Sequence, residues 1–564
     1  MSLLSRSLFA LILTSVLVGT GIAETPSVKT EMNQTKVEMT LVSKALYNEA
    51  AYIPSQCYTK TQDDHGNIHN PCYTCHVESK QPNFINDHDL QTAYDFPEYA
   101  TRNRWTNLFE DRSDKVAAIS DSEILTYVRE SNYRDNNGNI ILSETLREVP
   151  ADWDYNGDGK WSGFVPDCHF NFDEAGFDRT PSGGYSGWRT FSYTPFPGTF
   201  WPTNGSTDDV LIRLPDIFQQ DEQGNHSLDV YRVNLAIVEA LIKGNDVSID
   251  PVSEPDFGVD LNRDGSIQGI VDRVVFDWAP LKERHMYYVG AARLAQQERK
   301  VHLAAGLYPE GTEFLHSVRY IDFDDNGNVI LAARMKELRY ARKSAWFNYS
   351  TLREMALGEM RENVTWPERL RQLTGNMEVG VFNDQGWVYQ GFIEAANGSL
   401  RPQTYEETVF CIGCHSGLGA TSDGTFAFPR KMTASAFRKG WYHWSEKGLQ
   451  GTPEPVRNDG LGEYALYLAE NGAADELREN FEAIDRFFTS EGHIKPGMLE
   501  ALRNDITVLI HPSRERALQL NKAYRTIVKE QSFHKGRDAT VTPAVNVHRE
   551  VAQGQATGVT KVVR

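Results

Sequence analysis

The chain has 564 residues, of which 40% are hydrophobic, 24% charged and 11% aromatic. This composition is that of a globular protein long enough to bury several cores, and it excludes collagen, wholesale disorder and a polytopic membrane protein. The 57 Lys and Arg residues against 77 Asp and Glu residues give a formal charge of −20. Such a charge repels phosphate backbones and anionic lipid, so we expect no nucleic acid partner.

Residues 1–23 have the pattern of a secretory signal peptide. A single Arg6 precedes an apolar run from Leu8 to Val18, and small residues follow it. We therefore expect a protein exported to the periplasm or the extracellular space, with no transmembrane segment in its mature form. No cysteine lies near the expected cleavage site, so no lipid anchor is expected. The polar residues 24–44 are predicted to form a mobile leader.

Four of the six cysteines lie in two copies of the pattern Cys-x-x-Cys-His, at 72–76 and 411–415. One turn of helix places both sulfurs of such a motif on one side, where they can form thioethers with the two vinyl groups of a haem, and the histidine then lies beneath the iron. Zinc would need four ligands in one compact unit, and a thioredoxin-like pair needs neither the histidine nor a second copy. We therefore predict two covalently bound haem c groups, anchored by Cys72, Cys75, Cys411 and Cys414, with His76 and His415 as iron ligands.

Through these two motifs the sequence resembles the c-type cytochromes, specifically a dihaem member. The resemblance implies a protein that passes single electrons between redox partners, and the acidic surface would favour basic ones. The alternative is a dihaem oxidoreductase, peroxidase- or oxygenase-like, in which one haem transfers electrons and the other is open to a small-molecule substrate. Two minimal haem domains would leave much of the chain for other work, which favours the alternative, whereas the placement of the two motifs weakens it, and electron transfer is the activity we expect. No catalytic residue is assigned.

Cys57 and Cys168 stand outside the motifs. In an oxidising compartment two spare cysteines most simply form a disulfide, which we predict here. The competing interpretations are two buried free thiols, or a role for Cys168 and the neighbouring His169 near a haem.

The pattern predicts a mixed α and β, multidomain protein. Helical haem-binding segments are expected at both ends, around a middle region of β-hairpins and aromatic-rich loops. The predicted domains are a first haem-binding domain at 45–145, a mixed middle domain at 146–395, a second, helical haem-binding domain at 396–535 and an irregular tail at 536–564.

Two acidic loops resemble the calcium loop of EF-hands, with oxygen-bearing side chains at loop positions 1, 3 and 5 and Gly at 6. The residues are Asp154, Asn156 and Asp158 in one loop and Asp260, Asn262 and Asp264 in the other. The glutamate expected at position 12 is replaced by Val165 and Val271, although Asp167 and Asp272 lie nearby. The alternative is a pair of metal-free Asx turns. A third acidic stretch, 322–327, is predicted to be only the turn of a hairpin.

Several local patterns predict individual elements. Apolar residues at helical spacing predict helices at 122–130, 230–243, 463–489, 496–510 and 512–529. Turn signals predict hairpins at 317–331 and 378–394. Residues 185–201 contain seven aromatics and are predicted to be a rigid loop, serving either ordinary packing or the wall of a haem pocket.

A second iron ligand would decide whether an iron is closed or open to substrate. His443 is the preferred candidate for the second haem, since it follows the motif closely within the aromatic stretch around Trp441. His65, His69 and Met432 are the alternatives. Each of the four could instead be an ordinary surface or core side chain.

Overall fold

The computed structural model describes residues 49–76, 96–415, 423, 427–434, 440–442, 444–472, 480–561 and 563. The predicted signal peptide, the leader at 24–44 and His443 lie outside these residues. Val42–Arg564 form one compact unit. Within the described parts, no helix is long and apolar enough to span a membrane.

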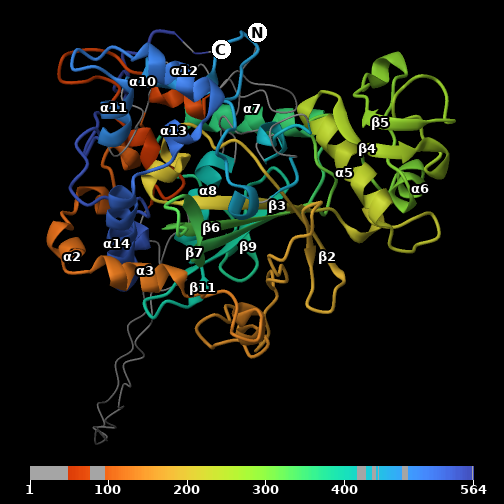
Figure 1. The fold of residues 1–564 in the computed structure, drawn as a ribbon, viewed down its shortest axis with the longest axis horizontal. Coiled ribbons are helices and arrows are strands. Elements are labelled where there is room, and N and C mark those ends of the chain that lie inside the picture. The colour runs from red at the N-terminus through yellow and green to blue at the C-terminus, as the bar shows by residue number, and fades with distance from the viewer. Residues whose placement is uncertain are drawn as a thin grey trace, which may run out of the picture. The chain divides into compact units, whose positions relative to one another are not determined.

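An antiparallel sheet, nine-stranded in the described part of the chain, forms the centre of this unit (Figure 1). Its strands are β1 Phe177–Arg179, β2 Tyr185–Phe191, β3 Thr207–Arg213, β6 Glu313–Phe323, β7 Val329–Lys343, β8 Gly375–Asn376, β9 Gly380–Phe382, β10 Trp387–Glu394 and β11 Leu400–Pro402. Their order is β1-β2-β3-β6-β7-β10-β9-β8, with β11 also paired to β10. The two strands β4 Val247–Ser253 and β5 Ile270–Val274 form a separate small sheet.

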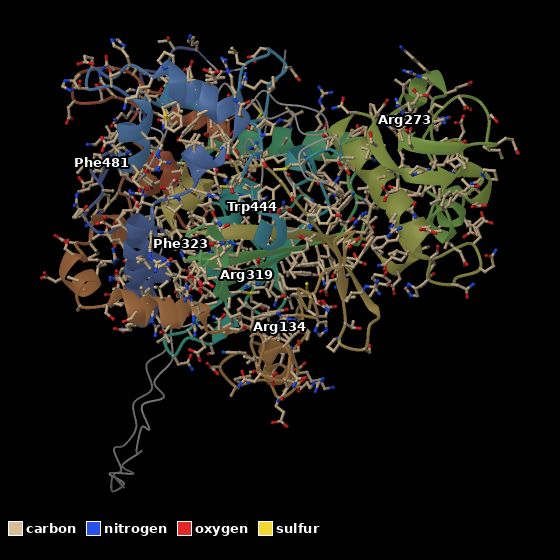
Figure 2. The ribbon with its side chains drawn as sticks, viewed as in Figure 1. Arg134, Arg273, Arg319, Phe323, Trp444 and Phe481 are labelled. Carbon is tan, nitrogen blue, oxygen red and sulfur yellow. The ribbon has the colours of Figure 1, made fainter. Side chains whose placement is uncertain are left out.

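The helices surround the sheet and are short except for three. They are α2 Ser113–Ala117, α3 Asp121–Arg129, α4 Ile141–Thr145, α5 Leu228–Lys243, α6 Ala291–Gln297, α7 Tyr349–Thr365, α8 Tyr405–His415, α9 Trp444–Lys447, α10 Glu463–Asn471, α11 Phe481–Phe487, α12 Pro496–Asn504, α13 Thr507–Ile510 and α14 Arg514–Glu530. Helices α3 and α14 pack against β6, whereas α5 and α6 lie with β4 and β5 in a lobe at one side (Figure 1). Figure 2 shows Arg273 of β5 in this lobe, apart from Arg319 of β6 in the central sheet.

Both faces of the sheet are buried, because side chains alternate along each strand and different segments cover the two sides. On one face Tyr320 packs with Ile527 of α14 and with Val128 of α3. A separate cluster joins Leu315 of β6 and Leu338 of β7 to the segment that contains α4. The prediction of a mixed α and β protein is therefore confirmed.

The strongest local predictions are confirmed. The helix predicted at 230–243 is α5, which begins with its Val230 amide on the Ser227 hydroxyl and ends at Gly244 in the left-handed conformation. The helix predicted at 122–130 is α3. The predicted hairpins are β6–β7, in which Phe323 opposes Val329, and β9–β10, in which Phe382 opposes Val388.

Three predictions need correction. The helix predicted at 463–489 stops at Asn471, because Gly472 takes a positive φ of 66°. The helix predicted at 496–510 is interrupted at Asp505, which is extended and caps Thr507 with its carboxylate. The aromatic run at 185–201 is not a loop throughout, since its first seven residues are strand β2, paired with β1 and β3.

The predicted tail at 536–564 is irregular but packed. It runs beside the first cysteine-containing segment, where the Lys60 amide donates to the Asn546 carbonyl and Thr59 forms a β-bridge with Val547. Val547 and Val551 are buried by this pairing. The two ends of the described chain therefore support each other.

Candidate functional site

The second Cys-x-x-Cys-His motif forms the last turn of α8. The helix begins with a capping box, in which the Thr404 hydroxyl accepts from the Glu407 amide and the Glu407 carboxylate accepts from the Thr404 amide. Arg401 holds the same carboxylate at 2.9 Å. This start fixes the helical phase, so that Cys411, Cys414 and His415 all line one cavity of about 270 Å³.

The floor of the cavity is a row of residues across four strands. Val210 of β3 opposes His316 of β6, His316 opposes Arg339 of β7, and Arg339 opposes Gly391 of β10. Directly opposed residues point to the same face of an antiparallel sheet. His316 and Arg339 therefore face α8, and both line the cavity.

Aromatic side chains form much of the wall. Tyr193, Phe196 and Phe200 come from the aromatic run that the sequence singled out, and Tyr389 and Phe410 come from β10 and α8. Other residues of that run serve ordinary packing, since Trp188 is buried in the core under the sheet. In Figure 2, Trp444 lies near the strands of the central sheet. Its amide donates to the Asp209 carboxylate of β3.

The wall also carries an excess of positive charge. Its described residues include the cations Lys336, Arg339, Arg430 and Arg537 against the carboxylates of Glu337 and Asp538. Arg430 is balanced by Glu463, at 2.8 Å, but the excess persists without it. The cavity is thus positive inside a protein of formal charge −20.

Glu337 is the buried anchor of this charge. Its carboxylate lies 2.9 Å from Arg339 and 2.7 Å from Arg537, and it accepts a hydrogen bond from Gln403 at 3.0 Å. Burial alone would raise the pKa of Glu337, but the two guanidinium groups outweigh it and lower the pKa to about 2. One carboxylate therefore positions two arginines beside the motif.

His415 is held as a neutral imidazole. Burial and, to a smaller extent, the nearby His316 and Arg339 together lower its pKa to about 4. A neutral imidazole keeps a nitrogen lone pair for a metal, which a protonated ring lacks. The cysteines, the histidine and the positive wall thus combine soft attachment points, a metal donor and a site for acidic groups.

The first motif lies beside the second, although Cys72 and Cys411 are 339 positions apart along the chain. It forms the 3₁₀ turn Pro71–Thr74 and the residues that follow, not an α-helix. A side-chain hydrogen bond joins Cys75 to Cys414 and lowers the pKa of Cys414. A side chain on Gly413 would come within 2.2 Å of the Tyr52 carbonyl oxygen, so the segment before the motif packs directly on α8.

The predicted disulfide between Cys57 and Cys168 is not formed in the structure, where both are free thiols. Cys168 is fully buried beneath the sheet in one cluster with Tyr133. Cys57 instead lies near the cysteines of the two motifs, where burial and the neighbouring Cys414 and Cys72 raise the pKa of its thiol. The two sulfurs belong to separate parts of the core, so the even number of spare cysteines was a misleading signal.

The two acidic loops are ordered by their own backbone. The Asp154 carboxylate accepts from the amides of Gly157, Asp158 and Gly159, as in an Asx turn. A glutamate from outside each loop supports it: Glu378 accepts from the Tyr155 amide, and Glu254 accepts from the Leu261 amide. Within the described residues, no three His, Cys, Asp or Glu side chains converge as a metal site. Calcium at Asp154, Asn156, Asp158, Asp260, Asn262 and Asp264 therefore stays a prediction.

The alternative iron ligands named from the sequence do not line this cavity. His69 pairs with Asp63 at 3.1 Å, His65 is exposed, and Met432 belongs to the core around Trp201. His316 was missed. Alternation along 313–323 places it on the face of Phe314 and Val318, but only the sheet order shows that this face meets α8.

Fold and site together define a mixed α and β protein with a positive, aromatic-lined cavity next to five clustered cysteines. Residues 41–504 match a lipoprotein family, whose description ends in "-like lipoprotein". The chain is also 31% identical to an "Uncharacterized lipoprotein" of Aquifex aeolicus (strain VF5), over 88% of this chain and 87% of the relative. The chain therefore belongs to this lipoprotein family. No solved structure matches it.

This membership corrects the functional expectation. Identification as a dihaem c-type cytochrome, with electron transfer between basic redox partners or dihaem oxidoreductase activity, was wrong. That resemblance used two five-residue motifs, whereas the family match spans 41–504. Two short motifs carry local attachment chemistry but say nothing of the protein around them. Membership in a lipoprotein family does agree with export.

Proposed function

We propose that this lipoprotein-family member is a haem-binding protein, in which the cavity beside α8 holds a covalently attached haem c. The observation that carries the proposal is the convergence of Cys411, Cys414 and His415 on one aromatic-lined, positively charged cavity. The motif alone predicts attachment, and the cavity supplies a place for the attached group.

The residues present fit such a group. A haem is a flat apolar ring with two carboxylate arms and a central metal, so it needs apolar walls, cations and a donor nitrogen. Aromatic residues such as Phe196 and Phe410 would pack against the ring and exclude water, and Arg339 and Arg537 would face the carboxylates. His415, kept neutral by burial, would ligate the iron.

His316 is the side chain that we propose would help His415 to hold the iron. It lines the same cavity as His415 and is close enough to lower the pKa of that residue. When bound, the haem would supply an iron centre whose properties depend on the side chains that hold it. Replacing His316 with Ala should therefore change the visible spectrum of the ferric protein while leaving the haem attached.

The first motif supports a second attachment site, with Cys72 and Cys75 as anchors and His76 as ligand. This motif lies directly beside the proposed site of Cys411 and Cys414, as the contact between Cys75 and Cys414 indicates. We therefore propose two haem c groups that lie close together in one unit of the protein.

Intact-mass measurement under denaturing conditions tests the proposal. The chain is exported in cells that contain the haem-attachment machinery, and the purified protein should carry the mass of two haems. The double variant Cys411→Ala, Cys414→Ala should lose one of them. Cys168→Ala is the matched control, because Cys168 is buried under the sheet away from both motifs. A wild-type protein of unmodified mass would contradict the proposal.

A further inference from the structure

The backbone carbonyl of His415 is held by two side chains from the hairpin β9–β10. The Asn383 side-chain nitrogen donates to this carbonyl at 2.9 Å, and the Tyr389 hydroxyl donates to it at 3.1 Å. His415 is the last residue of α8, and the last carbonyls of a helix have no partner within the helix. A carbonyl oxygen has two lone pairs, so the two donors satisfy the end of α8 at this position.

Asn383 belongs to a turn that recurs along the chain. In this turn one side-chain oxygen accepts from the amides two and four residues later, which at Asn383 are those of Gln385, at 2.9 Å, and Trp387, at 3.1 Å. The same two bonds are made by an aspartate at Asp63, Asp135, Asp173, Asp221 and Asp324. The turn therefore needs only an acceptor, which aspartate supplies. Asparagine adds a donor, and at position 383 that donor reaches His415.

The hairpin that carries the two donors is itself fixed. Asn383 is 1% exposed and Tyr389 is 4% exposed. Because the Asn383 oxygen accepts from two backbone amides, its nitrogen is the atom that faces His415. A side chain on Gly386 would lie 2.3 Å from the Ala345 carbonyl oxygen, so the turn packs directly on the segment that follows β7.

The chain beyond the motif returns to the same hairpin. The Asp423 carboxylate accepts from the Trp387 indole at 2.7 Å and from the Tyr308 amide at 3.0 Å, and it pairs with Lys343. Residues on both sides of the segment after the motif, His415 and Asp423, are thus bound to the hairpin β9–β10.

We propose that Asn383 and Tyr389 are positioning residues, which fix the direction in which the His415 imidazole enters the cavity. The helix holds the amide side of His415 and the two donors hold its carbonyl side, which restricts rotation of the backbone between them. The centre of the Tyr389 ring also lies 5.7 Å from that of the imidazole, and Tyr389 lines the same cavity. The inference rests on the proposed function, because a fixed direction matters for a side chain that ligates a metal.

Amide hydrogen exchange in the haem-free protein tests the hold on the backbone. The full chain is exported in cells without haem-attachment machinery, and exchange is followed by mass spectrometry in peptides from α8. Tyr389→Phe removes one donor and keeps the ring, so the amides in the last turn of α8 should exchange about fivefold faster. Asn383→Ala should have an effect at least as large. Exchange at the wild-type rate in both variants would overturn the inference, whatever the haem content of the protein.

Each variant has a matched control. Tyr231→Phe also removes a buried hydroxyl that donates to a backbone carbonyl, that of Gly187, at 2.7 Å. Asp324→Ala removes the same two turn bonds as Asn383→Ala, but it removes no donor to α8. Both controls should leave the exchange of α8 at the wild-type rate. Faster exchange of α8 in either control would attribute the effect to a general loss of stability and overturn the inference.

The haem-loaded protein tests the role toward the iron. When Tyr389→Phe and Asn383→Ala are exported with the attachment machinery, they should keep the wild-type mass, and the low-temperature EPR signal of one ferric iron should shift. The two controls should keep the wild-type signal. An unchanged signal in both variants with haem attached would overturn the inference and leave the proposed function standing. A wild-type protein without haem would contradict the proposed function itself, and with it the role of Asn383 and Tyr389 toward the iron.

Discussion

Glu337 offers the most direct test of how the cavity is charged. Its side chain is 3% exposed, it lies between Arg339 and Arg537, and its pKa falls from 4.5 to about 2. A carboxyl with a lowered pKa in the folded state stabilises the protein above its unfolded pKa, and this stability is lost as the pH falls through the folded pKa. The difference of about 2.5 corresponds to about 3 kcal/mol, of which about 2 kcal/mol is lost between pH 7 and pH 3.

Replacing Glu337 with Gln should have two effects. At pH 7 the variant should lose roughly 3–5 kcal/mol in the free energy of unfolding, because two guanidinium groups lose their shared buried carboxylate. Between pH 7 and pH 3 the variant should lose about 2 kcal/mol less than the wild type, because the titrating group is gone. Carboxyl groups elsewhere titrate in both proteins and cancel in this comparison.

Urea unfolding followed by tryptophan fluorescence at pH 7 and pH 3 measures both effects. Glu222→Gln is the control, since Glu222 is exposed on a turn and should leave both values unchanged. If Glu337→Gln and the wild type lose the same stability between the two pH values, Glu337 does not hold the two arginines as an ionised carboxylate.

Two other predictions concern the backbone and the acidic loops. Gly176 and Gly183 both have a positive φ, of 80° and 86°. A side chain at Gly176 would lie 1.9 Å from the Trp441 carbonyl oxygen, whereas a side chain at Gly183 would have open space around it. Gly176→Ala should therefore lower the melting temperature well below that of Gly183→Ala, and equal melting temperatures would show that the Trp441 segment moves aside freely. If Asp154 and Asp260 hold Ca²⁺ at 100 times its dissociation constant, a chelator removes about 2.7 kcal/mol and lowers the melting temperature. The double variant Asp154→Asn, Asp260→Asn should no longer respond to the chelator, and a wild-type melting curve that ignores the chelator would leave the loops as turns.

The sequence predicted individual helices and hairpins well. Helix α5 and the hairpins β6–β7 and β9–β10 follow from periodicity and turn residues, because capping, φ preference and side-chain alternation act between near neighbours. The same reasoning failed at Gly472 and Asp505, where single residues end helices that the apolar spacing would have continued. The spacing of apolar residues indicates which face of a helix is buried, but not the residue at which the helix ends.

The sequence predicted the chemical roles of residues only within each short motif. The pattern at 411–415 identified the cysteines and the histidine, and the aromatic run was noted as a candidate wall. The identification as a cytochrome was wrong, because ten residues carried it and family membership depends on the whole chain.

The tertiary structure decided which residues meet. His316 was one histidine among fifteen in the sequence, and it joined the site because β6 lies between β3 and β7 in the sheet. Cys57 was expected beside Cys168 and lies instead with the motif cysteines. Such pairings depend on strand order and on packing between segments hundreds of residues apart. No local propensity encodes them, because they arise from the burial of the whole core at once.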